Sequence, residues 1–253
     1  MRSSDAAPRI TQKEAVIRAL RAYGGTATLG QLYQTAVRVP GSHWQGTRTP
    51  FASIRRIVQE DAEVFFKIRP GLWGLVESQE AASLVEAARR EPELFDHSYY
   101  QGLLLELGKL RGCETFVPAQ DQNREMFQRR LGDIATLKEY PPFTYPELLK
   151  RGRTIDVTWF RAGFADLQMP ASFYEVEHST DFQNSLLKFM DLFDFRAEFV
   201  VVADKVRKPE FDRKMQQTAF KPIREFVSFW TYDELAREYE RSSAKQVVGS
   251  SGA

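Results

Sequence analysis

The stretch ASFYEVEHSTDFQNSLLKFMDL, residues 171–192, places two glutamates on a predicted strand directly before a predicted amphipathic helix. Side chains alternate between the two faces of a strand, so Glu175 and Glu177 point the same way, together with Phe173. Two carboxylates this close repel each other unless water, a basic partner, a shared proton or a metal ion compensates them. The segments around this stretch indicate which of these applies.

Strand and helix patterns alternate along the rear of the chain. The uninterrupted apolar run AEFVVVAD (197–204) is typical of a strand buried on both faces. An apolar stripe predicts a helix over YYQGLLLELGKL (99–110), and further strands are predicted over ETFVPA (114–119), TIDVTWF (154–160), SFYEVEH (172–178) and EFVSFW (225–230). This order predicts an α/β fold with a mixed central sheet flanked by helices.

Acidic residues occur on two consecutive predicted strands. Asp156 and Glu175 lie 19 positions apart, and a short connection joins their strands. If the strands are neighbours, Asp156 lies beside Glu175 and Glu177. Mg²⁺ relieves such repulsion because it prefers oxygen ligands, needs one or two carboxylates, and bridges to phosphate oxygens. The pattern therefore predicts a Mg²⁺ site suited to phosphodiester hydrolysis, with Mn²⁺ as a substitute.

The acids Asp156 and Glu175, with Val176 and Glu177 after them, resemble the motif of the PD-(D/E)XK nuclease superfamily. That resemblance implies that Asp156 and Glu175 bind the metal and that the Val176 carbonyl adds a ligand. Glu177 stands where the motif usually has lysine, and the resemblance gives it the role of general base or water-positioning group. A further acid on the first helix is common in such families, and Glu106 on the predicted stripe of helix 99–110 is the candidate.

A different interpretation of the same acids is that they face water or pair with basic residues on an open sheet. The helix after the E-x-E strand carries Gln183 and Lys188 off its apolar stripe. The superfamily resemblance allows such a helix to donate polar groups to the site or to DNA, but an exposed polar face is the expected use of both residues. His178 is expected to face away from the two glutamates and either to serve packing or to support the site residues from behind.

The front of the chain has the element order of a winged helix. Thr11 is a predicted N-cap for the helix KEAVIRALRAY (13–23), and a second helix is predicted over residues 29–37. A third helix begins at Pro50 after the N-cap Thr49, and two strands follow around the turn at Pro70-Gly71. Three helices followed by a hairpin predict a small α+β winged-helix domain.

The third helix of this domain is expected to present polar residues to the groove of duplex DNA. Basic residues on the hairpin are expected to contact phosphates. Trp44 is either a base-stacking residue or, as is more common for such a tryptophan, a cover for the core. The predicted DNA-binding residues are Trp44, Arg48, Thr49, Ser53, Arg55, Arg56, Gln59, Lys67 and Arg69. If the unit serves protein contact instead, its arginines form a solvated face.

The segments KEAVIRAL, LGQLY, TPFASIRRIV and FFKIRPGLWGL resemble the HARE helix-turn-helix family, over about residues 8–77. This resemblance implies recognition of double-stranded DNA and leaves sensitivity to base modification open. The charge distribution agrees with it. Residues 1–77 carry 11 Lys and Arg against 6 Asp and Glu, whereas residues 78–253 carry 24 against 28.

Composition limits the other classes. The single cysteine, Cys113, excludes an internal disulfide and a cysteine-rich zinc site. The chain shows no apolar signal-peptide core and no apolar run of about 20 residues, so a cytoplasmic protein without membrane association is expected. No phosphate-binding loop of the GxxxxGK type is present, and no nucleotide cofactor is expected.

Together these features predict a restriction-type Mg²⁺-dependent endonuclease that cuts double-stranded DNA and acts as a homodimer. The alternative is an inert DNA-binding regulator or specificity subunit whose nuclease-like domain serves assembly. The expected domains are a winged helix over 1–77, a helical linker over 78–96, a restriction-endonuclease-like domain over 97–241 and a disordered tail over 242–253.

Overall fold

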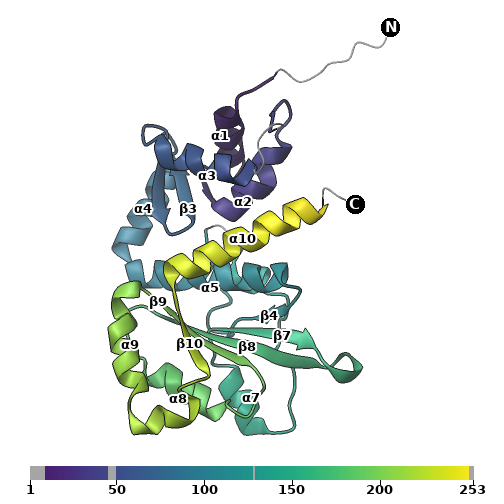
Figure 1. Cartoon of the computed structure of the whole chain (residues 1–253), viewed down its shortest axis with the longest axis vertical. Helices are drawn as coiled ribbons and strands as arrows, with labels where there is room; N and C mark the ends of the chain where they lie inside the picture. Colours follow the sequence, from purple (N-terminus) through teal and green to yellow (C-terminus); the bar gives the residue numbers. More distant parts are fainter. Residues whose placement is uncertain (1–8, 45–49, 128, 251–253) are drawn as a thin grey trace. The chain divides into compact units, whose positions relative to one another are not determined.

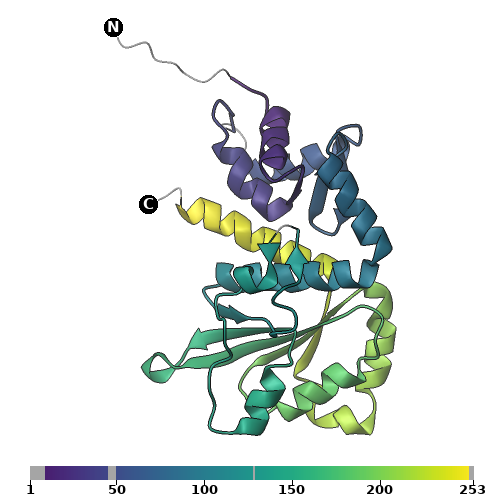
Figure 2. The same ribbon diagram turned by 180° about the vertical axis from the view of Figure 1, so that it is seen from behind.

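The computed structural model describes residues 9–44, 50–127 and 129–250, and the chain divides into two units (Figures 1 and 2). One unit comprises Met1–Arg90 together with Arg237–Ala253, and the other comprises Glu91–Ala236. The expected boundaries at 77, 97 and 241 therefore differ from those of the structure. Helix α4 (Gln79–Arg90), which fills most of the expected linker, belongs to the first unit.

The first unit begins with helices and a small antiparallel sheet of strand order β1-β3-β2. As predicted, Thr11 caps α1, accepting a hydrogen bond from the Glu14 backbone N–H at 3.1 Å, and Pro50 is the first residue of α3. The elements are α1 (Gln12–Ala22), β1 (Thr26–Thr28), α2 (Leu29–Thr35), the 3-10 helix η1 (Ala36–Arg38), α3 (Pro50–Glu60), β2 (Phe65–Arg69) and β3 (Leu72–Leu75).

Helix α10 (Tyr232–Ser250) starts in the second unit and contributes its larger part to the first. Residues 242–250 are thus helical where the sequence predicts disorder. Tyr239, Ser243 and Val247 form a buried stripe at four-residue spacing. Gly30 of α2 leaves room for it, because a Cβ at Gly30 would lie 2.5 Å from both the Tyr239 ring and Ser243 Oγ. The Ser- and Gly-rich composition of the segment conceals this stripe.

The second unit is built on a mixed five-stranded sheet of order β10-β9-β8-β7-β4. Strand β9 pairs in parallel with both its neighbours and is buried after its first residue, as its apolar run predicts. The elements are α5 (Pro92–Leu110), β4 (Glu114–Phe116), β5 (Glu125–Met126), β6 (Arg129–Arg130), α6 (Leu131–Ile134), α7 (Pro146–Gly152), β7 (Val157–Ala162), η2 (Phe164–Asp166), β8 (Gln168–Glu177), α8 (Gln183–Asp191), β9 (Glu198–Ala203), η3 (Lys205–Arg207), α9 (Lys208–Met215), η4 (Thr218–Ile223), β10 (Val227–Thr231) and α10.

Helices cover both faces of this sheet (Figures 1 and 2). On one face Trp159 of β7 donates a hydrogen bond to the Leu104 carbonyl of α5 at 3.0 Å and packs against Gly108. On the other face Phe173 of β8 joins a cluster with Leu186 and Phe189 of α8. The sheet is therefore a fixed layer that holds the ends of β7 and β8 in place between α5 and α8.

Asp156 lies just before β7, not inside a strand as predicted. The β7–β8 ladder ends at the pair Val157–Tyr174. Beyond it the Val176 backbone N–H donates to Asp156 Oδ2 at 2.8 Å, so a side chain takes the place of a ladder partner. Within the described ranges, no helix combines the length and apolar composition that crossing a membrane requires.

Candidate functional site

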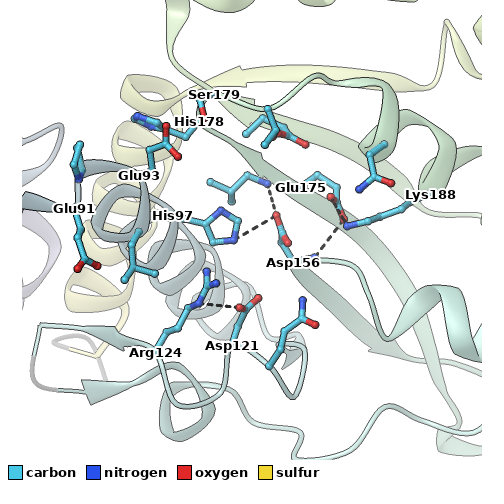
Figure 3. A pocket seen from close by; sticks show the side chains of 17 residues that line it. Glu91, Glu93, His97, Asp121, Arg124, Asp156, Glu175, His178, Ser179 and Lys188 are labelled. Atoms are coloured by element: carbon cyan, nitrogen blue, oxygen red, sulfur yellow. Dashed lines mark hydrogen bonds and ion pairs between the residues drawn. The ribbon is translucent and has the colours of Figure 1, made fainter.

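A pocket of about 620 Å³ lies in the second unit, beside Asp156 and the end of β8 (Figure 3). Four of its lining carboxylates are buried, namely Asp121, Asp156, Glu175 and Glu177. The lysine and arginine that line it, Lys188 and Arg124, supply two positive charges. The negative charges thus exceed the positive ones among these buried groups.

Asp156 and Glu175 are neighbours, as the strand order predicts. The Asp156 backbone N–H points to Glu175 Oε1 at 3.4 Å, while the Asp156 carboxylate accepts from Val176. Their side chains therefore meet at the point where β8 continues past the start of β7.

Lys188 of α8 forms an ion pair with Glu175 in the pocket. Its Nζ lies 2.9 Å from Glu175 Oε1 and 2.8 Å from Oε2, and it also donates to the Thr154 carbonyl at 2.9 Å. The Lys188 side chain is only 12% exposed. The expected exposed position for Lys188 is therefore wrong, although Gln183 on the same helix is exposed. The structure thus places an ammonium group from α8 against Glu175.

Ser185 joins the two glutamates of the strand. Its hydroxyl lies 3.0 Å from Glu175 Oε2 and is also hydrogen-bonded to Glu177 Oε1. Thr180 Oγ1 donates to the other oxygen of Glu177. Glu175 and Glu177 therefore share one face of β8, as predicted. A hydroxyl carries a single proton, so both Ser185 contacts are hydrogen bonds only when one carboxyl is protonated.

Burial changes the titration of this group. It raises the pKa of Asp156 to about 7 and that of Glu175 to about 8, although the charge of Lys188 opposes both shifts. Burial alone would lower the pKa of Lys188, but Glu175 and Asp156 raise it above its ordinary value. Lys188 therefore stays charged, whereas burial favours the protonated forms of Asp156 and Glu175.

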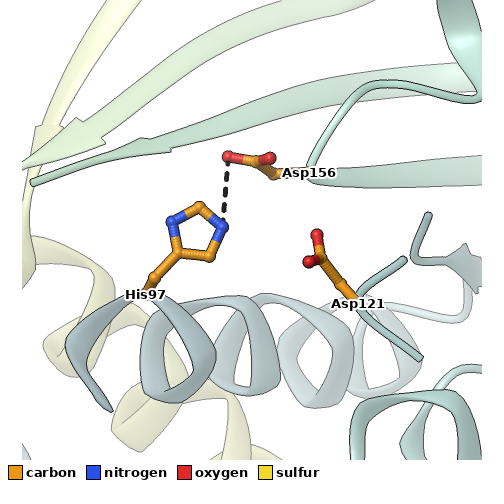
Figure 4. A group of neighbouring side chains, drawn as sticks. All are labelled: His97, Asp121 and Asp156. Carbon is orange, nitrogen blue, oxygen red and sulfur yellow. Dashed lines mark ion pairs between the residues drawn. The ribbon is translucent and has the colours of Figure 1, made fainter. Parts of the chain in front are cut away.

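A second set of groups faces Asp156 from α5 and from the turn after β4 (Figure 4). His97 Nε2 lies 3.7 Å from Asp156 Oδ2. Burial lowers the pKa of His97. Asp121 accepts from Gln101 Nε2 at 3.0 Å, and the same amide donates to the Asp156 carbonyl at 3.2 Å. Gln101 thus ties Asp121 to the backbone at Asp156.

Glu106, the predicted acid on the first helix, does not line the pocket. It pairs with Arg129 at 2.8 Å and with Lys109 at 3.2 Å. On a helix of 3.6 residues per turn, nine positions correspond to half a turn beyond two full turns. Glu106 therefore faces away from the side of α5 on which His97 lies, so the structure gives Glu106 no contact with the other predicted ligands.

The sequence interpretation missed His97 and Asp121, which line this pocket, and Ser185, which contacts Glu175 and Glu177 from α8. It favoured an exposed face over the site for Lys188. Ser185 and Lys188 carry a signal, since a polar i,i+3 pair beside the apolar stripe of α8 shares one helical face. His97 and Gln101 have the same kind of signal at i,i+4 on α5. Asp121 has none, because it lies in a turn whose position depends on tertiary structure. His178, expected to serve packing or to support the site residues, lines the pocket and lies 3.8 Å from Asp96.

The predicted DNA-binding residues of the first unit have different surroundings. Trp44 donates to the Ala36 carbonyl at 3.2 Å and packs on the core, in agreement with the covering role. On α3, Arg55 forms an ion pair with the buried Glu240 of α10, whereas Arg56 is exposed and lies 4.0 Å from Glu60. The structure thus directs Arg55 towards α10.

The other predicted contacts of this unit lie on α3 and β2. Gln59 is exposed and Ser53 is partly buried. On β2, Lys67 is exposed, and Arg69 donates to the Ile68 carbonyl at 3.0 Å. Arg48 and Thr49 lie outside the described residues.

Comparison with known proteins gave one family match. The model of the type II restriction enzyme NmeDI C-terminal domain matches residues 78–251. No curated protein and no solved structure matches the chain. The match extends over the whole second unit, including every residue of the pocket.

Proposed function

The chain belongs to the family of the type II restriction enzyme NmeDI C-terminal domain, and from this premise we propose that it is a metal-dependent endonuclease that hydrolyses phosphodiester bonds in double-stranded DNA. The observation that carries the proposal is the Asp156–Glu175–Lys188 group in one pocket. This group joins two carboxylates to an ammonium that can stabilise negative charge at a phosphate.

The oxygen donors of the pocket fit a divalent cation. Asp156 and Glu175 are buried side by side, and burial raises the pKa of both because it disfavours their charged forms, which a bound cation would stabilise. Mg²⁺ would be bound by Asp156, Glu175 and the Val176 carbonyl, with Mn²⁺ as a substitute. When bound, such an ion polarises a phosphoryl oxygen and lowers the pKa of bound water.

The side chains of the chain itself have separate tasks in this proposal. Lys188, held by Glu175 and the Thr154 carbonyl, places its ammonium next to the scissile phosphate and neutralises charge as the reaction proceeds. Glu177, fixed by Thr180 and Ser185, orients the attacking water and takes its proton. The water oxygen bonds to phosphorus while the bond from phosphorus to one ester oxygen breaks, and that oxygen departs with the cut strand end and takes a proton from solvent water.

The first unit is proposed to bind duplex DNA as a winged helix of the HARE type. Support comes from the order of its elements, from the excess of basic residues in 1–77 and from the exposed face of α3 with Arg56 and Gln59. Double-strand cleavage requires two active pockets, so the proposed active form is a homodimer.

The alternative function draws on the same ion pair. Lys188 contacts both oxygens of Glu175, and such internal compensation also suits an inert pocket in a DNA-binding regulator or specificity subunit. The two functions differ in whether metal leads to cleavage.

Cleavage of plasmid and phage DNA, methylated and unmethylated, tests the proposal in Mg²⁺, Mn²⁺ and EDTA. We expect metal-dependent fragments that disappear in Asp156→Ala and a decrease of about 10²-fold or more in rate for Lys188→Met. Glu106→Gln and Lys205→Met, which alter an acid outside the pocket and an exposed lysine, serve as matched controls and keep the wild-type rate. Intact DNA in every metal, with a gel shift that EDTA leaves unchanged, would instead favour the alternative.

A further inference from the structure

Three potential ligand atoms converge on the α5 side of Asp156. One atom each from His97, Asp121 and Asp156 lies within 4.8 Å of the other two (Figure 4). The residues come from three different segments: α5, the turn after β4 and the approach to β7. Asp121 and Asp156 are buried, and all three line the pocket. Small side-chain movements bring such atoms to the roughly 2.0–2.2 Å at which imidazole and carboxylate bind a divalent ion.

The carboxylate of Glu175, on the other side of Asp156, is paired with Lys188. Its Oε1 contacts Lys188 and the Asp156 backbone N–H, and its Oε2 contacts Lys188 and Ser185. A carboxylate has about four acceptor positions, and Lys188 occupies one on each oxygen. A cation on that side competes with Lys188, whereas a cation on the α5 side does not.

The ligand atoms on the α5 side keep free acceptor positions. Asp121 Oδ2 accepts from Gln101, and its Oδ1 lies 3.0 Å from Arg124 Nε, which occupies one position on each oxygen. Gln101 is fully buried and donates to Asp121 and to the Asp156 carbonyl, so one amide orients two of the three residues.

The charge balance of the pocket also admits a cation. Four buried carboxylates face Lys188 and Arg124, the lysine and the arginine that line the pocket. When the carboxylates are ionised, one divalent ion compensates the two remaining negative charges. A phosphate that enters the pocket brings further negative charge.

We propose that His97, Asp121 and Asp156 form a cation site of their own, which prefers Mn²⁺ and similar transition-metal ions to Mg²⁺ and Ca²⁺. The preference follows from the imidazole ligand, since Mg²⁺ and Ca²⁺ select oxygen ligands and transition metals accept nitrogen. The site deepens the proposed function and shares only Asp156 with the proposed Mg²⁺ ligands. It requires ion binding and not DNA cleavage.

Pulsed electron paramagnetic resonance of the full chain with less than one equivalent of Mn²⁺ tests this site directly. We expect electron–nuclear coupling to an imidazole ¹⁴N in the wild type. His97→Ala should remove the coupling, and His97→Ala and Asp121→Asn should each weaken Mn²⁺ binding by about tenfold or more. His178→Ala is the matched control, because His178 lines the same pocket, and it should keep the coupling.

Tight Mn²⁺ binding by the wild type without nitrogen coupling would contradict the proposed site. This measurement uses the wild type alone, so it does not depend on whether a variant folds. Coupling that persists in His97→Ala and disappears in His178→Ala would also contradict the proposed site, because it would identify His178 as the ligand. Glu175→Gln should retain the coupled Mn²⁺ signal, and its loss there would place the ion on the Glu175 side. None of these readouts uses cleavage, so a chain that binds Mn²⁺ through His97 but leaves DNA intact would contradict the nuclease proposal alone.

Discussion

At the scale of single residues, the pocket contains two carboxyl groups whose ionisation is opposed by burial. The pKa of Asp156 is raised from 3.8 to about 7 and that of Glu175 from 4.5 to about 8. A folded-state pKa above the unfolded-state value means that the folded chain binds more protons between the two values. The stabilisation by these groups is therefore complete below about pH 4 and is lost as the pH rises through about 7 to 8.

We predict that the wild type loses stability relative to Asp156→Asn as the pH increases from 5 to 8.5 in EDTA. The slope is on the order of 1 kcal/mol per pH unit, since one unit of pKa shift corresponds to about 1.4 kcal/mol. Asparagine keeps an acceptor for the Val176 N–H but carries no charge. Mg²⁺ should restore stability mainly at the high-pH end, where the carboxylates are ionised.

Thermal unfolding of both proteins across this pH range, with and without Mg²⁺, measures the effect. A constant difference in Tm between the wild type and Asp156→Asn would show that burial does not hold the proton on this carboxyl group.

The residues of the site were predictable where their signal is local. Glu175 and Glu177 share a face because strand side chains alternate, and Asp156 lies beside them because it directly precedes β7, the strand that pairs with β8. Lys188 and His97 reach the same pocket from helices on opposite faces of the sheet. The periodicity of a single segment cannot predict that two such residues lie close together. Glu106 was chosen as a ligand because it lies on the apolar stripe of its helix, but it faces away from the side of α5 that lines the pocket.

At the scale of elements, helices α3 and α10 are joined by an ion pair inside the first unit. The Glu240 side chain is 6% exposed, and Arg55 is its partner, with 40% of its own side chain exposed. A buried carboxylate without a partner is costly, so Arg55 contributes to stability here. Arg56, the next residue, projects to solvent and remains available to DNA.

The neighbouring arginines give a matched pair of variants. We predict that Arg55→Met lowers the free energy of unfolding by about 1–3 kcal/mol, because Glu240 loses its partner. Arg56→Met should change stability by less than about 0.5 kcal/mol. Arg56→Met should instead weaken duplex binding and flatten its salt dependence, because a cation near phosphate is removed.

Scanning calorimetry and fluorescence anisotropy with duplex DNA at several salt concentrations separate the two roles. Equal stability of both variants, together with weaker DNA binding by Arg55→Met, would return Arg55 to the DNA-reading face.

The helices and strands were largely predictable, because capping residues, apolar stripes and the run 197–204 are local signals. Residues 242–250 were not. Their sequence SSAKQVVGS is polar. The helical stripe that it continues is buried because Gly30 leaves space for it on α2, and this contact cannot be predicted from the segment alone.

At the scale of the whole molecule, the chain passes between its two units twice, at Arg90–Glu91 and at Ala236–Arg237. The second passage lies inside the continuous helix α10. The family match over 78–251 includes α4 and all of α10. Helix α4 and the part of α10 from Arg237 onward belong to the first unit, so the matched segment supplies two pieces of that unit.

We predict that a chain truncated after Ala236 has a weakened first unit and an intact second unit. The truncation removes Glu240, the partner of Arg55, and uncovers α2 at Gly30. Hydrogen exchange should show faster exchange in α1, α2 and α3, while β7, β8 and β9 keep their protection. A chain that ends at Ser250 is the control. Unchanged protection in α2 and α3 after truncation would show that α10 is dispensable for this unit.

Because α10 belongs partly to the first unit, it sets requirements for any N-terminal segment that replaces the present one during evolution. A chain with a different N-terminal segment would still contain α10. The new segment would therefore need a residue as small as glycine at the position of Gly30 and a basic side chain to pair with Glu240. Without these two features, the buried stripe of α10 would be exposed and the Glu240 carboxylate would lose its ionic partner. Recombination at residue 77 or 90 is therefore expected to succeed only between lineages whose N-terminal segments and final helices have diverged together.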